Sequence, residues 1–126
     1  MARRDLTGAV DFKHLEGFAA GDQQVVDEVL ALFREQAAMW VRLLDPAAKD
    51  EAWRDAAHTL KGSALGVGAH DLAEACAAAE RAVTANLAER TVRLEKVRDA
   101  LDAALADIAA YVHEQALRSL KSPSAR

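Results

Sequence analysis

The stretch Trp53-Arg54-Asp55-Ala56-Ala57-His58-Thr59-Leu60-Lys61-Gly62-Ser63-Ala64-Leu65 carries the most informative pattern in the chain. Within it, Trp53, Ala57, Leu60 and Ala64 follow one another at steps of four, three and four residues. This spacing is typical of a helix that buries one face. We therefore expect a helix here, with Trp53 and its companions in the core and the remaining positions turned toward solvent.

The same helical spacing recurs on both sides of this stretch, and short turns separate the segments. Asp11 and Asp22 are candidate N-caps for two earlier helices, and Asp50 for the helix quoted above. Gly66 and Gly68 are expected to end that helix, because glycine readily adopts the left-handed conformation of a helix C-terminus. No segment alternates between polar and apolar residues over a useful length, so no strand is predicted. The expected helices cover residues 11–19, 22–44, 51–65, 69–85 and 88–120.

Four long amphipathic helices with short connections predict an all-α fold, namely an antiparallel up-down four-helix bundle with a short additional N-terminal helix. Thirty of the 126 residues are alanine, and only six are glycine and two proline, which agrees with long helices. The length fits a single domain, residues 1–126, with a core at about residues 11–120. Residues 1–10 and 121–126 are expected to be flexible.

Composition and charge exclude several functional classes. The net charge is −4, and the arginines are interleaved with acidic residues rather than gathered in a basic stripe, so no nucleic-acid partner is expected. No apolar run approaches the roughly 18 residues that a membrane span requires, so no membrane role is expected. Cys76 is the single cysteine, which rules out an intramolecular disulfide and suits a reducing cytoplasm. The predicted localisation is therefore cytoplasmic.

The face of the helix that carries His58 groups side chains that suit phosphoryl chemistry. Residues three and four apart lie over one another on a helix, so His58 shares its face with Lys61 and Gly62 and, one turn further, Leu65. A neutral imidazole is a nucleophile near neutral pH. Lys61 could neutralise a phosphoryl group as a mobile point charge. Gly62 would leave the imidazole unshielded, and Leu65 would offer an apolar contact to a partner.

These residues resemble the signature of histidine-containing phosphotransfer (HPt) domains. The resemblance is carried by the run from His58 to Ala64, by Val67-Gly68-Ala69 and by Leu72, and it extends over about residues 11–112. It implies a four-helix bundle, the fold that periodicity predicts independently. It also implies a phosphorelay intermediate that accepts a phosphoryl group on His58 and transfers it to or from an aspartate of a response-regulator receiver domain.

The resemblance further implies the partners and the division of labour between them. The expected partners are a receiver domain and a sensor or hybrid histidine kinase, and the expected state is a monomer. The receiver would supply Mg²⁺, so no cofactor of the chain's own is expected. The family places a polar residue 22 positions after the histidine to orient the imidazole, and here that residue is Glu80. A carboxylate that accepts a hydrogen bond from Nδ1 would leave Nε2 free to attack.

Two other functional classes remain as alternatives. A catalytically silent four-helix adaptor would bind a signalling partner through the surface around Leu65, although the intact histidine motif argues against it. An autonomous kinase or phosphatase is disfavoured, because the glycines at 66 and 68 lack the lysine and the Ser or Thr of a phosphate-binding loop. Gly62 has its own alternative, in which it permits close packing between helices.

The remaining chemistry-bearing residues are interpreted as structural. His14, His70 and His113 lack a comparable setting and are expected at the surface. His70 and Glu74 have the i, i+4 spacing of metal ligands, but Cys76 points elsewhere and no second pair completes a ligand set. No metal site is therefore predicted, and Cys76 is expected to act as a small hydrophobic core residue.

Overall fold

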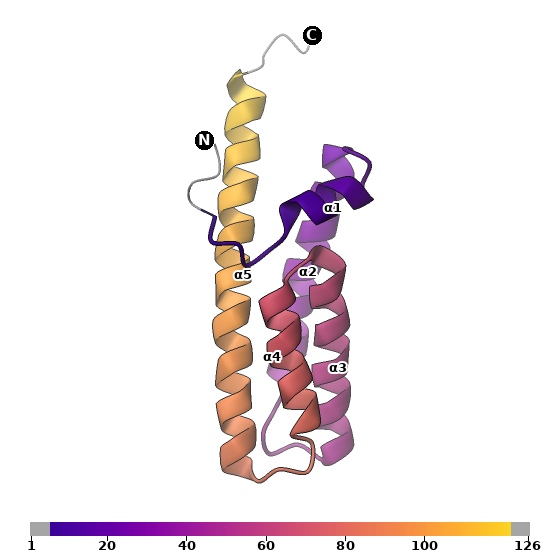
Figure 1. Ribbon diagram of the computed structural model, residues 1–126, viewed down its shortest axis with the longest axis vertical. Helices are drawn as coiled ribbons and strands as arrows, with labels where there is room; N and C mark the ends of the chain where they lie inside the picture. The colour runs from indigo at the N-terminus through magenta and orange to yellow at the C-terminus, as the bar shows by residue number, and fades with distance from the viewer. Residues whose placement is uncertain (1–5, 122–126) are drawn as a thin grey trace.

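The computed structural model describes residues 6–121, and within that range every regular element is a helix. Consecutive long helices run in opposite directions and form a bundle, while the short first helix lies across one end of it (Figure 1). The all-α up-down bundle with an additional N-terminal helix is therefore confirmed. The elements are α1 (Phe12–Phe18), α2 (Gln23–Leu43), α3 (Asp50–Val67), α4 (His70–Arg81) and α5 (Leu87–Lys121).

The N-terminal ends of the helices follow two of the three predicted caps. The carboxylates of Asp11 and Asp22 accept hydrogen bonds from backbone N–H groups in the first turns of α1 and α2, as expected. The prediction for Asp50 is wrong, because α3 begins at Asp50 itself and the residue before it, Lys49, makes no side-chain cap. The Asp50 carboxylate binds the guanidinium group of Arg90 instead.

The C-terminal ends of α3 and α4 differ from the predicted ones. α3 continues through Gly66 and ends at Val67, where Gly68 takes a φ of 80° in the left-handed region. A glycine inside a helix costs only about 0.5–1 kcal/mol relative to alanine, and burial of Val67 offsets this cost. α4 ends at Arg81, about four residues earlier than predicted, and the Val83 carbonyl that follows accepts a hydrogen bond from Arg90.

The core follows the predicted stripes over most of its length. Trp53 and Cys76 are fully buried, as the sequence analysis expected. The steps of four, three and four residues between Leu101, Leu105, Ile108 and Val112 predict one buried seam, but Val112 is exposed and Tyr111 is buried in its place. The reason is that the Tyr111 ring stacks on Phe12 of α1, with 4.2 Å between ring centroids, which turns this side of α5 toward the core.

The segment before α1 is fastened to the bundle at two points. The buried carboxylate of Asp107 on α5 accepts hydrogen bonds from the backbone N–H groups of Thr7 and Ala9 and from the Thr7 hydroxyl. The N–H of Asp11 donates to the carbonyl of Gly68 at 2.9 Å, in the turn between α3 and α4. Ala9 and Val10 are consequently buried and belong to the hydrophobic core.

Gly68 is the one position at which this fastening requires a glycine. A Cβ atom there would lie 3.0 Å from the carbonyl oxygen of Asp11, on a backbone whose positive φ already disfavours other residues. Flexibility is expected for residues 1–10 and 121–126; of these, residues 1–5 and 122–126 lie outside the described range, whereas Thr7 and Ala9 are hydrogen-bonded to Asp107. No helix within residues 6–121 is both long and apolar enough to cross a lipid bilayer.

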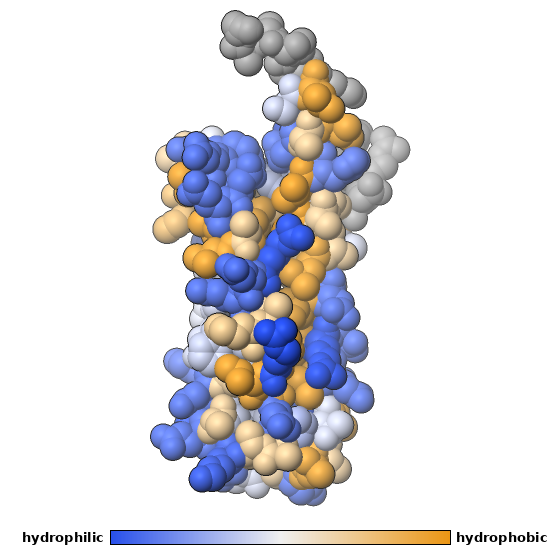
Figure 2. Space-filling model, turned by 180° about the vertical axis from the view of Figure 1, so that it is seen from behind, coloured by the Kyte–Doolittle hydropathy of each residue, from blue (hydrophilic) through white to orange (hydrophobic). Residues whose placement is uncertain are grey.

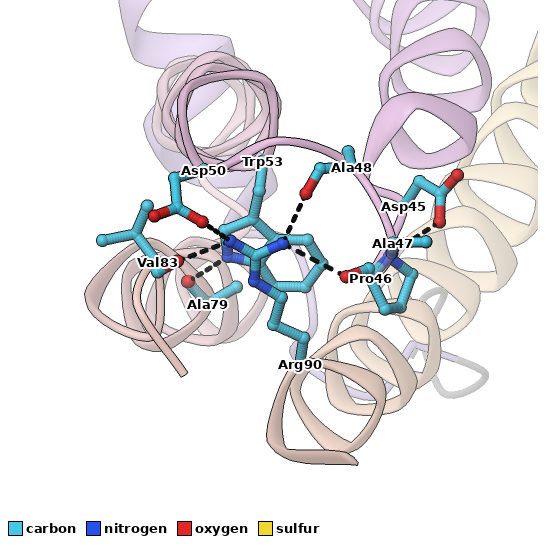
Figure 3. A network of polar contacts seen from close by, with 9 residues as sticks. All are labelled: Asp45, Pro46, Ala47, Ala48, Asp50, Trp53, Ala79, Val83 and Arg90. Carbon is cyan, nitrogen blue, oxygen red and sulfur yellow. Dashed lines mark hydrogen bonds and ion pairs between the residues drawn. The ribbon is translucent and has the colours of Figure 1, made fainter. Parts of the chain in front are cut away.

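A buried arginine joins three helices at the end of the bundle opposite α1 (Figure 3). The Arg90 guanidinium donates to the backbone carbonyls of Pro46 and Ala48 at 3.1 and 2.7 Å, and to the Asp50 carboxylate at 2.6 Å. It also lies 5.0 Å from the ring centroid of Trp53, a cation–π distance. Arg90 on α5 thus holds the turn between α2 and α3 and the first turn of α3 in one place.

The side of the bundle where α2 and α5 meet has hollows on its surface. Figure 2 shows a band of apolar side chains along the seam between α2 and α5. Shallow hollows along this seam are lined by Ala31 and Leu105 and, nearer the C-terminal end of α5, by Val112 and Ala116. The helices α3 and α4 lie on the opposite side, in front of α2 in Figure 1.

We predict that Arg90→Ala destabilises the fold by about 2–4 kcal/mol, because partly buried backbone carbonyl groups and the Asp50 carboxylate would lose their charged donor. Urea unfolding followed by circular dichroism measures this. The matched control is Arg98→Ala on the exposed face of α5, which should change stability by less than about 0.5 kcal/mol. Equal effects of the two substitutions would show that the Arg90 contacts contribute no more than a surface arginine.

Candidate functional site

The register between α3 and α4 places a carboxylate opposite His58. The indole N–H of Trp53, on α3, donates to the backbone carbonyl of Ala79, on α4, at 2.7 Å. This buried hydrogen bond fixes how far the two helices are shifted along each other. Glu80 follows Ala79 and His58 lies just over one turn beyond Trp53, so the two side chains meet on the outer edge of the α3–α4 pair.

Glu80 binds two side chains of α3 at once. Its Oε2 atom lies 3.0 Å from Nδ1 of His58, and its Oε1 atom accepts a hydrogen bond from Nζ of Lys61 at 2.8 Å. The imidazole is 66% exposed, whereas the Glu80 and Lys61 side chains are only 24% and 28% exposed. The structure therefore brings together His58, Lys61 and Glu80, three of the five residues that the sequence analysis assigned to the site.

The electrostatics of this arrangement define which nitrogen of His58 carries the proton. The hydrogen bond from Lys61 lowers the pKa of the Glu80 carboxyl group most strongly, burial opposes this, and the hydrogen bond with His58 lowers it further. Glu80 is consequently ionised at neutral pH and can only accept hydrogen bonds. The contact with His58 then places the ring proton on Nδ1, which leaves the lone pair of Nε2 available for attack on a phosphorus atom.

The surface next to the imidazole is open and partly apolar. Gly62 is exposed, and apart from its own helix backbone and chain neighbours nothing lies within 4 Å of the position that a Cβ atom would occupy. The interpretation that Gly62 permits close helix packing is therefore wrong. Leu65 is 50% exposed, one turn further along α3. Gly62 and Leu65 thus leave the approach to His58 open and give it an apolar margin.

The other candidate residues lie away from this chemistry. His14, His70 and His113 are exposed, and His70 lies 4.0 Å from the Asp11 carboxylate. Burial raises the pKa of the Cys76 thiol to about 12, so the thiol remains protonated and acts as part of the core. Among residues 6–121, no three His, Cys, Asp or Glu side chains gather closely enough to hold a metal ion.

Two features of the site were missed from the sequence. The ion pair between Lys61 and Glu80 was not expected, because Lys61 was assigned to a phosphoryl group alone. Their opposite charges could have suggested it once both residues were placed on facing helices near His58. The hydrogen bond by which Trp53 sets the register of α3 and α4 was also missed. An apolar stripe identifies Trp53 as a core residue, but it does not show that its N–H donates to a backbone carbonyl on the next helix.

Comparison with known proteins identifies the class to which this site belongs. Residues 23–113 match the family model of the Hpt domain, so the chain is a member of the histidine-containing phosphotransfer family. The solved structure of the histidine phosphotransferase ShpA from Caulobacter crescentus is 62% identical to it. The match covers 90% of this chain and 99% of that one, with a TM-score of 0.74. A search of curated proteins found no match. The chain thus has a phosphorelay role in histidine phosphotransfer.

The lowered pKa of Glu80 predicts a pH-dependent contribution to stability. Because the folded-state pKa lies below the ordinary value of 4.5, the contribution is present above pH 4.5 and is lost as the pH falls through the folded-state pKa. Glu80→Gln should therefore be less stable than the wild type at neutral pH, and the difference should shrink as the solution is acidified below pH 4.5.

Urea unfolding across this acidic range measures the difference. The control is Glu74→Gln, an exposed position on the same helix, which should change stability by less than about 0.5 kcal/mol. A stability difference between wild type and Glu80→Gln that stays constant on acidification would contradict the assignment of an ionised, hydrogen-bonded Glu80.

Proposed function

We propose that this protein accepts a phosphoryl group on Nε2 of His58 and exchanges it with an aspartate of a response-regulator receiver domain. The observation that carries the proposal is the exposed His58 ring, whose Nδ1 is bound to the carboxylate of Glu80 at 3.0 Å. That contact orients the ring and prepares Nε2 as a nucleophile. The openness of the surface at Gly62 gives a phosphorylated partner room to approach in line.

The exchange with the receiver is a simple displacement at phosphorus. The lone pair of His58 Nε2 forms a bond to the phosphorus of the phosphoaspartate, and the bond between phosphorus and the aspartate oxygen breaks. Its electron pair leaves with the aspartate carboxylate. The proton on Nδ1 stays on the ring, where Glu80 accepts its hydrogen bond and stabilises the positive charge that develops on the imidazole. Transfer in the other direction reverses each of these changes.

The remaining site residues have supporting roles in this proposal. Lys61 neutralises negative charge on the incoming phosphoryl group. Gly62 keeps the path to Nε2 free of side-chain atoms, and Leu65 packs against an apolar position of the receiver. The receiver supplies the Mg²⁺ that balances the charge of its own phosphoaspartate, and the chain needs no cofactor of its own.

The proposal also specifies the protein's place between its partners. Its partners are a response-regulator receiver domain and a sensor or hybrid histidine kinase, and the chain exchanges the phosphoryl group with them as a cytoplasmic monomer. It has no kinase activity of its own. Of the alternatives, the silent adaptor would keep the binding surface around Leu65 without any phosphoryl exchange at His58.

We predict that a phosphorylated receiver labels the wild-type protein and that His58→Ala abolishes the label. The label should be lost in acid and persist in alkali, as a phosphorus–nitrogen bond requires. His113→Ala, at an exposed histidine on α5, is the matched control and should be labelled like the wild type. Label retained in His58→Ala would refute the site. Receiver binding without label in the wild type would favour the silent adaptor.

We also predict that Gly62→Gln slows phosphotransfer by at least about ten-fold, since its side chain would crowd the reacting nitrogen and displace the partner. The helix content should stay unchanged, because space at this position is open. Gly62→Ala is the control, and it should stabilise the protein by about 0.5–1 kcal/mol while slowing transfer much less. Stopped-flow or gel-based transfer assays measure the rates. Wild-type transfer rates in Gly62→Gln would remove Gly62 from the docking surface.

A further inference from the structure

Lys61 is already occupied in the unphosphorylated protein. Its ammonium group donates to Oε1 of Glu80 at 2.8 Å, and both side chains are about three-quarters buried. The other oxygen of the same carboxylate is in contact with Nδ1 of His58. One carboxylate thus connects the lysine and the histidine, and a phosphoryl group on His58 would compete with that carboxylate for the ammonium group of Lys61.

Phosphorylation of His58 would change the charges on both sides of Lys61. A phosphoryl group on Nε2 brings two negative charges, whereas Glu80 carries one. At equal distance, a lysine is attracted about twice as strongly by the dianion. At the same time the ring, which keeps its proton on Nδ1, becomes positively charged beside Glu80 and can replace Lys61 as the partner of the carboxylate.

We propose that Lys61 exchanges partners during the phosphorylation cycle: it holds the Glu80 carboxylate against His58 in the resting protein and moves to the phosphoryl group when His58 is loaded. The inference rests on the function proposed above. It makes Lys61 a positioning residue in one state and a phosphate ligand in the other. The flexible four-carbon stem of lysine suits such a movement, and its position one turn after His58 keeps both partners within reach.

The exchange has a consequence for how tightly the phosphoryl group is held. When Lys61 binds the phosphoryl group, it loses its ion pair with Glu80. The free energy gained from the new contact is therefore partly offset by the free energy of the ion pair that is lost. The phosphohistidine is therefore less stabilised than it would be beside an unpaired lysine. A shuttle must release the group to the next aspartate, and this competition favours release.

Carbon-13 NMR of the Glu80 side-chain carboxyl group tests the exchange directly. The full-length protein is phosphorylated with phosphoramidate at mildly alkaline pH, and the resonance is compared between wild type and Lys61→Met, before and after phosphorylation. Lys61→Met should shift the resonance in the resting protein, and the shift should fall to less than half in the phosphorylated protein. Phosphorus-31 NMR should show the converse, with the phosphohistidine signal differing between wild type and Lys61→Met.

Lys96→Met, at an exposed position of α5, is the matched control and should move neither signal. A Glu80 resonance that responds equally to Lys61→Met in both states would overturn the exchange while leaving His58 as the phosphoacceptor. A phosphohistidine signal that is insensitive to Lys61→Met would overturn it as well. If phosphoramidate and a phosphorylated receiver both fail to load His58, the proposed function fails and the exchange falls with it.

Discussion

The buried contact between Arg90 and Trp53 is the constraint on which the arrangement of this bundle depends. Arg90 donates hydrogen bonds to carbonyl groups of the turn between α2 and α3 and lies over the Trp53 ring. The Trp53 N–H in turn donates a hydrogen bond to the backbone carbonyl of Ala79 on α4. Helices that meet only through alanine and leucine side chains can slide along each other, because such contacts are similar at neighbouring registers. Directional hydrogen bonds to backbone carbonyls define one register, and in that register Glu80 lies opposite His58.

The site itself uses few groups, and each acts through the next. Lys61 lowers the pKa of Glu80, the ionised carboxylate fixes the proton of His58 on Nδ1, and Nε2 is left as the nucleophile. The surface beside the site contributes by leaving His58 accessible, because Gly62 has no side chain to obstruct the approach of a partner. Such an arrangement suits a module whose partner brings the metal ion and the activated phosphoryl group.

The sequence predicts the parts of this structure that depend on local pattern. The spacing of Trp53, Leu60 and Ala64 places the core face of α3 correctly, and Asp11 and Asp22 cap their helices as expected. His58, Lys61 and Glu80 are assigned to one site from the motif and its family resemblance, and the structure places them in contact.

What the sequence does not predict depends on contacts between distant segments. Asp50 has the properties of an N-cap, but a stronger partner, Arg90, takes its carboxylate from a position 40 residues away. Asp107 and Arg90 are charged residues, a type that is usually found at the surface, yet both are buried because backbone groups of other segments satisfy them. Gly66 lies within α3 rather than ending it, because burial of Val67 favours another turn.

The central claim is that Glu80 commits His58 to react through Nε2. The most direct measurement is a long-range proton–nitrogen NMR spectrum of the phosphorylated protein with nitrogen-15 in its histidines, which identifies the ring nitrogen that is bonded to phosphorus. The structure predicts phosphorus on Nε2 and a proton on Nδ1, hydrogen-bonded to Glu80. Phosphorus on Nδ1 would contradict it, because the contact between Nδ1 and Glu80 would then have to be broken for the reaction to occur.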